Sequence, residues 1–347
     1  MLEVRRLVLL RELSIRGSVT AVAQSMNMAP SSVSAQLAVL ERETRTELLR
    51  RSGRGVQLTA EAQALVARID PILDALEEAE TALTRARNSV TGRVQLALFQ
   101  SAAIALLPRA LTILRERHPE LRLEVFQYEP ETALHETWVR DVDVVVAEQY
   151  PGHAAPHWPG LDRKELLRDD LQLVVPAELS VDGAALPEGR ELETLLTARP
   201  LPWVMEPDGT ATRHWAEQVC RSAGFEPDVR YISSDLQSHV GLVASGNAVA
   251  LLPGLMLVDT PAAVRRIRLP GDPLRTVFTS IRSSSAQSPA ITAVRGILEE
   301  AAAELTPAPR RSRSRQLPVE SACRTISCAR DLDGEGSRVL VSAYARG

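Results

Sequence analysis

The chain has 347 residues, of which 45% are hydrophobic and 24% are charged, as in an ordinary soluble globular protein of two or three domains. Aromatic residues make up only 3%, so the predicted cores are aliphatic. No apolar run approaches the ~20 residues of a membrane-spanning helix, and Arg5, Arg6 and Arg11 interrupt any N-terminal signal sequence. Three cysteines without a CxxC pair exclude a disulfide scaffold, so we expect a reducing, cytoplasmic location.

The net charge of −4 is unevenly distributed. Residues 1–60 contain nine arginines and five glutamates, and residues 305–347 contain eight arginines and four acids, so each segment carries +4 and residues 61–304 carry −12. A basic head on an acidic body favours a polyanion as the partner of the head. The segment 305–347 is rich in Pro, Arg and Ser without apolar periodicity, which predicts a disordered tail.

Residues 1–59 are predicted to form three short helices and a hairpin. A helix over 3–16 ends at Gly17, and two shorter helices follow with only three residues between them. Asn27 tolerates the left-handed conformation of a tight turn, and Pro30 suits the first turn of the helix over 30–41. Gly53 and Gly55 flank an arginine between short apolar runs, which predicts a hairpin, or wing, with that arginine at its tip.

The helix over 30–41 buries one apolar stripe, Val33, Leu37 and Leu40, and offers small groups on its other side. A helix presented by a tight turn fits the major groove, and small side chains let its backbone approach the bases closely. The alternatives are a unit that contacts only protein and, for each arginine, ordinary solvated charge. The predicted DNA-binding residues are Pro30, Ser31, Ser32, Ser34, Ala35 and Gln36 of the helix, and Arg50, Arg51 and Arg54 of the wing.

From Leu58 to Val90, apolar residues recur at alternating steps of four and three, which is a heptad pattern. It predicts a linker helix over 60–90 that packs against the helix of a partner chain, with Pro71 kinking it or dividing it locally. The alternative is a long helix lying on its own domain. The predicted dimer contacts are Leu65, Ile69, Ile72, Leu76 and Leu83.

Residues 91–304 alternate apolar strand-like runs with helical stretches, which predicts two α/β lobes with parallel sheets. Lobe I comprises residues 91–166 and 268–304, and lobe II comprises residues 167–267. Two crossovers are expected, near Arg168 and near Pro270.

Ligands of open α/β sheets bind at the carboxyl ends of strands, often at the starts of helices. Gln100-Ser101 and Asp208-Thr210 occupy such positions, and we expect the two turns to face each other across the lobes. Helix-start N–H groups suit an effector with a carboxylate or other anionic group, to which Arg213 would add a counter-charge unless it pairs with Glu206 or Asp208. The alternative is that Ser101 and Thr210 are only helix caps. Weaker candidates are Glu148, Gln149 and Ser234.

Motifs of catalysis are absent from the sequence: there is no GxSxG, HExxH, P-loop or GxGxxG. His153 and His157 lie in a Pro- and Gly-rich loop that no helix brings together, and Cys220 sits where a small buried residue would pack. Cys323 and Cys328 fall in the predicted tail. We therefore expect no enzyme activity, no metal site and no cofactor other than a small-molecule effector.

Taken together, these features resemble the LysR-type transcriptional regulators over residues 2–304. The resemblance is most specific in "GSVTAVAQSMNMAPSSVSAQLAVLE" (17–41) and in the wing "LLRRSGRGVQLTAEA" (48–62). The chain departs from the family pattern at Asn27, usually Gly, at residues 29–32, usually Ser-Gln-Pro-Ala, and at Ala35, often basic. The base-reading residues therefore do not transfer intact from the family.

The resemblance implies a winged helix-turn-helix over 1–59, a linker helix, and a periplasmic-binding-protein-like effector domain that binds its ligand between two lobes. The implied partners are double-stranded DNA, a small-molecule effector and further copies of the chain, which would form a dimer or tetramer. No membrane partner is expected. The competing hypotheses are a periplasmic-type binding lobe, or an enzyme on that fold, with an unrelated N-terminal module.

Overall fold

The computed structural model describes residues 2–52, 55–86, 90–181, 184–185, 195–259 and 261–305. The predicted tail, with Cys323 and Cys328, and the wing tip at Arg54 lie outside these residues. Within them, no helix is long and apolar enough to cross a membrane.

The N-terminal domain consists of α1 (Val4–Arg16), α2 (Val19–Ser25), α3 (Pro30–Thr44) and the antiparallel pair β1 (Leu49–Ser52) and β2 (Gly55–Leu58). Local sequence explains each boundary. Gly17 ends α1 with φ 71°, and the Ser18 hydroxyl caps α2 by accepting from the N–H of Ala21. Asn27 adopts φ 51° in the turn, and Pro30 opens α3. The predicted helices and wing are confirmed.

Helix α4 (Ala60–Ala86) follows the wing and continues through Pro71, which lies inside it and does not end it. Its 27 residues span about 40 Å. The Thr59 hydroxyl accepts from the N–H of Ala62 and so caps the helix start. Ala62, Ile69 and Leu73 complete the core that α1, α2 and α3 begin. The first half of α4 is therefore part of the N-terminal domain.

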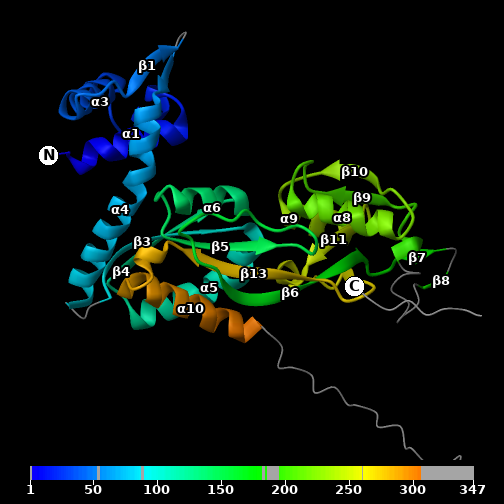
Figure 1. The fold of residues 1–347 in the computed structure, drawn as a ribbon. Helices are drawn as coiled ribbons and strands as arrows, with labels where there is room; N and C mark the ends of the chain where they lie inside the picture. The colour runs from blue at the N-terminus through cyan, green and yellow to red at the C-terminus, as the bar shows by residue number, and fades with distance from the viewer. Residues whose placement is uncertain are drawn as a thin grey trace, which may run out of the picture. The chain divides into compact units, whose positions relative to one another are not determined.

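Lobe I is a sheet covered by helices on both faces (Figure 1). Its strands are β3 (Gly92–Leu98), β4 (Leu121–Gln127), β5 (Val144–Gln149), β13 (Leu274–Ile281) and the first part of β6 (Lys164–Pro176). Helices α5 (Gln100–Arg117) and α10 (Pro289–Leu305) pack together on one face, and α6 (Pro130–Trp138) packs on the other.

Lobe II contains the parallel pair β9 (Pro202–Met205) and β10 (Asp228–Ile232), with α8 (Ala211–Ser222) and α9 (Leu236–Ala244). Trp203, Trp215, Cys220 and Phe225 are among its buried core residues. Strands β11 (Ala250–Pro253) and β12 (Val264–Arg268) pair with β6. The remaining elements are the short pair β7 (Ser180–Val181) and β8 (Ala184–Ala185), and the 3-10 turns η1 (Gly254–Leu257) and η2 (Ser283–Ser285).

The sheets correct one expectation, because they are mixed and not purely parallel. The order is β11-β6-β13-β5-β3-β4, and only β3–β4, β3–β5 and β9–β10 are parallel. Strand β6 is shared: it pairs with β13 as far as Asp170 and with β11 from Leu171 onward. This strand and the segment between β12 and β13 connect the lobes. The two-lobe α/β class itself is confirmed.

Candidate functional site

The recognition helix α3 divides cleanly into two faces. Val33, Leu37 and Leu40 are fully buried in the N-terminal core. The opposite face is open to solvent and consists of Pro30, Ser31, Ser32, Ser34 and Ala35. Gln36 is half-buried, and its Oε1 accepts from Arg6 Nε at 3.0 Å, which ties α3 to α1. The face that the sequence assigns to DNA is therefore free within the chain.

The wing is fixed to α3 by one carboxylate. Glu41 Oε1 accepts from the N–H groups of Leu48 and Leu49 at 2.8 and 3.0 Å, so β1 begins at a fixed place beside the helix. Arg50 and Arg51 on β1 are exposed, and Arg50 contacts only Glu47 by a 3.4 Å ion pair. A surface pair of this kind contributes little to stability, so these guanidinium groups remain available to phosphates.

Helix α4 corrects part of the predicted dimer seam. Ile69 is 0% exposed and Leu65 is half-buried, and both pack on the core of their own N-terminal domain. The heptad pattern alone does not reveal which surface the apolar residues pack against, and the first half of α4 packs against α1 of the same chain. In contrast, Ile72, Leu76 and Leu83 are 41%, 44% and 68% exposed in the single chain.

A buried arginine, Arg275 of β13, lies where the lobes meet and is only 1% exposed. Its Nη2 lies 2.7 Å from both Asp169 Oδ2 and Ser101 Oγ, and its Nη1 binds Glu148 and, at 3.2 Å, Tyr150 Oη. The guanidinium also lies 5.1 Å from the ring centre of Phe99. A buried charge needs such partners, and this one draws together β5, β6, β13 and the start of α5.

Two sets of hydrogen bonds connect lobe I to lobe II beside Arg275. Thr212 Oγ1, in the first turn of α8, donates to Tyr150 Oη at 3.1 Å. Gln100 Nε2 donates to Asp235 Oδ1 at 2.6 Å, and Gln100 Oε1 accepts from the N–H of Leu236 at the start of α9. The expected partner of Gln100, the Asp208-Thr210 turn, is thus corrected to the start of α9.

The other predicted effector residues are scattered. Thr210 caps α8 by accepting from the N–H of Arg213 at 3.2 Å, which is the alternative role weighed for it. Arg213 binds Glu217, the carbonyl of Glu206 and, at 3.4 Å, Asp208, so its charge is already compensated. Asp208 and Ser234 are exposed, and Gln149 is half-buried at the end of β5. Of the candidates, the structure brings Ser101 and Glu148 together around Arg275.

Glu206, which follows β9, is the most unusual acid of this region. Its side chain is 7% exposed, and its Oε2 atom is buried without a hydrogen-bond partner within the described residues. Burial raises the pKa of Glu206 to about 7, although hydrogen bonds with Thr212 and Thr210 oppose the shift. Burial likewise raises the pKa of Glu148, against the attraction of Arg275.

The raised pKa of Glu206 predicts that ionising this carboxyl lowers the stability of the folded chain, so stability should depend on pH. The unfolded chain ionises this carboxyl near its ordinary pKa of 4.5, whereas in the folded chain the pKa is about 7, so stability falls as pH rises between these values. Glu206→Gln removes this cost, which is about 3 kcal/mol at most. We expect the thermal midpoint of Glu206→Gln to exceed the wild-type value at pH 8 by several degrees and to match it at pH 4.5. The exposed Glu178→Gln is the control, and a gap that does not change with pH contradicts the assignment.

Cys220 is buried in α8, as predicted, and burial raises the pKa of its thiol to about 12, which makes it unreactive. Among the residues that the structure describes, no group of three or more His, Cys, Asp and Glu side chains is placed to hold a metal ion.

Sequence reasoning missed the centre of the lobe junction. Arg275, Asp169 and Tyr150 come from three distant segments, and Ser101 meets Arg275 across 174 positions. The available signal was a charged residue at an inward-facing position of the apolar strand "LRTVFTSI". An arginine there is buried only with anionic partners, and sequence alone does not identify them.

Two family models match the chain. The helix-turn-helix model described as a bacterial regulatory protein of the lysR family matches residues 4–63, and the LysR substrate binding domain model matches residues 87–303. The transcriptional dual regulator GltC of Bacillus subtilis is 25% identical over 259 residues, which cover 75% of this chain and 83% of GltC. A probable nitrogen assimilation transcriptional activator of Synechococcus elongatus is 28% identical over 269 residues, covering 73% and 83%.

Solved structures share the fold. A full-length OxyR variant from Pseudomonas aeruginosa superposes with a TM-score of 0.61 at 16% identity, covering 87% of this chain and 95% of that one. Full-length BenM superposes with a TM-score of 0.51 at 20% identity, covering 89% and 100%. The predicted resemblance is confirmed, because the substrate-binding model alone spans more than half of the sequence. The chain belongs to the LysR family of ligand-responsive, DNA-binding transcriptional regulators.

Proposed function

We propose that this regulator acts in the cytoplasm and reads DNA with the exposed face of α3 in the major groove. The observation that carries the proposal is that face itself: small groups at Ser31, Ser32, Ser34 and Ala35, unused by the fold, on a domain of charge +4. Such side chains allow close backbone approach but offer few directional base contacts. Phosphate contacts from Arg50, Arg51 and the wing-tip Arg54, together with DNA shape, therefore supply a large share of affinity.

A charge reversal on this face tests the proposal. Ser34→Glu places a carboxylate against the bases and phosphates and should weaken DNA binding about tenfold or more, without lowering the thermal midpoint. Ser222→Glu adds the same charge at an exposed position of α8 and should leave DNA binding unchanged. Equal affinities of the two variants in a fluorescence anisotropy titration would place the DNA contact elsewhere.

The effector, on this proposal, binds at the lobe junction beside Arg275 and Glu206. Side chains already bind N–H groups at two helix starts of lobe II: Thr210 accepts from Arg213 N at α8, where an anion was expected, and Gln100 and Asp235 accept from Leu236 N and Gln237 N at α9. Glu148 and Asp169 instead bind Arg275, and the buried Glu206 lies close enough for the charge of Arg275 to act on its pKa. The geometry favours an effector that donates a hydrogen bond or carries a positive charge over the anionic effector expected from the sequence.

A thermal-shift comparison checks the effector class. Small amines and small carboxylates are offered to the wild type and to Glu206→Gln, the variant that replaces one carboxylate oxygen by an amide N–H. We expect stabilisation by an amine that the variant loses. Stabilisation by a carboxylate that survives in Glu206→Gln would restore the anionic assignment.

We propose that two copies associate through the second half of α4. Ile72, Leu76 and Leu83 face solvent, whereas Asp70 and Glu77 face the chain's own arginines. At about 100° per residue, the apolar and acidic faces lie nearly opposite each other. The helix therefore lies against its own chain with the acidic face and offers the other face to a partner. Regulation without catalysis fits the relatives named above, which are described as regulators.

A further inference from the structure

Two arginine networks lie at opposite ends of the same pair of strands. Strands β5 and β13 are antiparallel neighbours in register from Thr276–Gln149 to Ile281–Val144. Arg275 and Glu148 therefore meet at one end, at the lobe junction. Arg282 and Asp143 meet at the other end by a 3.1 Å ion pair. Arg282 lies seven residues further along the extended chain than Arg275, which is a distance of about 24 Å.

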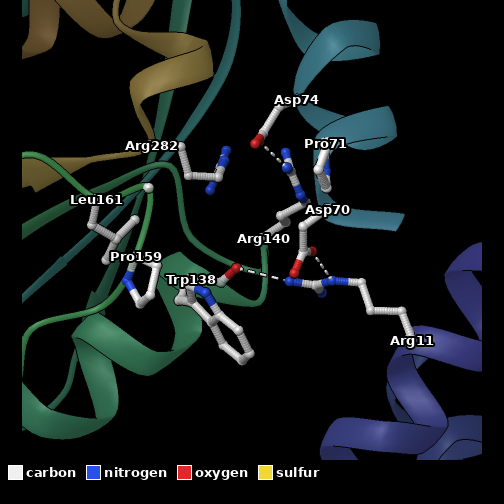
Figure 2. Close-up of a pocket in the computed structure, with 10 residues that line it drawn as sticks. Arg11, Asp70, Pro71, Asp74, Trp138, Arg140, Pro159, Leu161 and Arg282 are labelled. Atoms are coloured by element: carbon white, nitrogen blue, oxygen red, sulfur yellow. Dashed lines mark hydrogen bonds and ion pairs between the residues drawn. The ribbon is translucent and has the colours of Figure 1, made fainter. Parts of the chain in front are cut away.

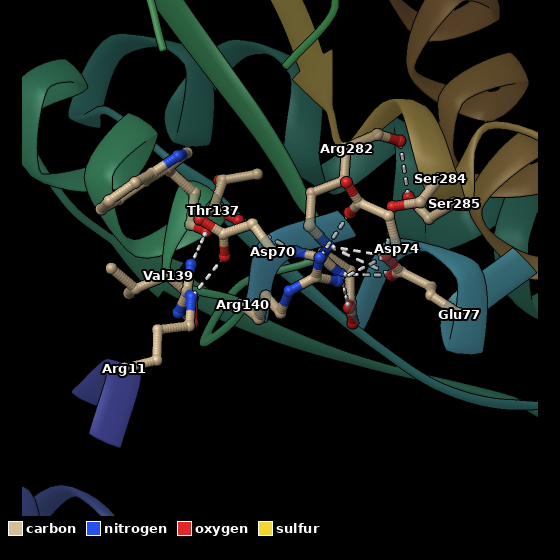
Figure 3. A network of polar contacts seen from close by, with 12 residues as sticks. Arg11, Asp70, Asp74, Glu77, Thr137, Val139, Arg140, Arg282, Ser284 and Ser285 are labelled. Carbon is tan, nitrogen blue, oxygen red and sulfur yellow. Dashed lines mark hydrogen bonds and ion pairs between the residues drawn. The ribbon is translucent and has the colours of Figure 1, made fainter. Parts of the chain in front are cut away.

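The far network joins lobe I to the linker helix (Figure 3). Arg282 Nη2 binds Glu77 of α4 at 2.9 Å, and Arg282 Nη1 donates to the carbonyls of Val142 and Thr137. Arg140 Nη1 and Ser284 Oγ also bind Glu77, at 2.7 and 2.5 Å. Burial alone would raise the pKa of Glu77, but Arg282 outweighs it and the pKa is lowered, so the carboxylate stays ionised.

Glu77 belongs to an acidic stripe that meets three arginines. Asp70 pairs with Arg11 of α1, and Asp74 pairs with Arg140 after α6. Arg11 also donates to the carbonyls of lobe I residues 138 and 139. Figure 2 shows Arg11, Asp70, Asp74, Arg140 and Arg282 around a pocket of about 270 Å³ beside α4.

The arginines of this pocket are already bound by acceptors of the chain itself, so they are not free to bind a ligand. Both terminal nitrogens of Arg11, Arg140 and Arg282 have acceptors within the chain. The contacts of Arg11, Arg140 and Arg282 thus fix the N-terminal domain and α4 on lobe I.

The strands between the two networks leave little room for independent movement. Val144, Val145 and Val146 of β5 are 0% exposed, and Val277 and Phe278 of β13 are buried beside them. Both strands are interior to the sheet, with β3 and β6 as outer neighbours. Close-packed interiors transmit displacement because they have no voids to absorb it.

We infer that the Arg282–Glu77 contact is the point at which a change at the lobe junction reaches the linker helix, with β5 and β13 acting as one rigid connection. The inference rests on the proposed function only in supposing that an effector acts at the Arg275 end. A ligand that alters the Tyr150–Thr212 contact shifts β13, and Arg282 then changes its alignment with the Glu77 carboxylate. Arg282 and Glu77 are positioning residues, and the ligand's differential affinity for the two arrangements sets the size of the response.

A double-mutant cycle without any ligand tests this inference. Tyr150→Phe removes the hydroxyl that joins Arg275 to Thr212, and Glu77→Gln removes the charge that holds Arg282. Hydrogen exchange of the α4 amides between residues 72 and 86 is measured in the full chain for the wild type, both single variants and the double variant. Changes about 24 Å apart normally act independently, so non-additivity reports coupling.

We expect Tyr150→Phe to change α4 exchange at least fivefold when Glu77 is present and to have no further effect in the Glu77→Gln chain. Glu300→Gln, which breaks the exposed Arg117–Glu300 pair on lobe I, is the matched control and should leave the effect of Tyr150→Phe intact. If Tyr150→Phe lowers the folded fraction, Thr212→Val breaks the same contact from lobe II.

Equal effects of Tyr150→Phe in both backgrounds, or no effect on α4 in either, would overturn the inference. The cycle contains no effector, so its failure leaves the proposed effector site standing. Conversely, an amine response that survives unchanged in Glu206→Gln, together with an intact cycle, would overturn the effector site alone.

Discussion

Replacing Arg275 by methionine should destabilise the protein by about 3–5 kcal/mol, because it leaves Glu148 and Asp169 buried without their counter-charge. Methionine fills much of the same volume, so the loss reports charge and not a cavity. In a domain of this size, the thermal midpoint should fall by about 10 °C near neutral pH. Thermal unfolding of the full chain, followed by circular dichroism, measures the effect.

The deficit of Arg275→Met should shrink as pH falls, since protonation of Glu148 and Asp169 removes the unpaired charges. Burial already raises the pKa of both carboxyls, so the recovery begins well above their ordinary range. Arg117→Met, at an exposed ion pair, is the control and should change stability little. A midpoint for Arg275→Met that stays near the control value at neutral pH would show that the network is not a structural centre.

Replacing Leu76 by aspartate should separate the chains. The residue is 44% exposed in the single chain, so the substitution leaves the fold intact. In a dimer, the substitution buries an unpaired aspartate in each chain. This makes the free energy of association less favourable by several kcal/mol, which corresponds to a loss of affinity on the order of 10³-fold. Sedimentation velocity at micromolar concentration should show a monomer where the wild type is a dimer or larger.

Two further variants separate association from folding. Ile232→Asp changes an apolar residue that is 60% exposed on β10 and should leave the dimer unchanged. Ile69→Asp changes a fully buried residue of the N-terminal core and should unfold that domain. An unchanged dimer of Leu76→Asp, or a monomeric wild type, would contradict the role assigned to α4.

Sequence patterns predicted the N-terminal domain well because its structure is set locally. Gly17, Asn27 and Pro30 each specify a turn or a helix end within a few residues. The sequence predicted the approximate length of the linker helix but not which of its residues pack against the same chain. The heptad pattern is continuous, yet Ile69 faces the chain's own core while Leu83 faces solvent.

The lobe junction was less predictable, because its contacts are non-local. Gln100 was expected at a helix start and lies there, but its partner is Asp235 and not the turn at Asp208. Ser101 was weighed as a ligand contact or a cap, and it accepts instead from Arg275. The sharing of β6 between lobes follows from strand pairing over long separations, which a single sequence does not encode in any local pattern.

We expect the N-terminal domain of this regulator to read a specific DNA sequence. Binding of the full chain to a duplex from upstream of its own gene, and to a scrambled duplex, tests it most directly when measured at about 50 and 200 mM salt. We predict that affinity for the upstream duplex exceeds that for the scrambled one on the order of 10³-fold, and that both affinities fall steeply with salt. Equal affinity for the two duplexes, or binding that does not respond to salt, would contradict this function.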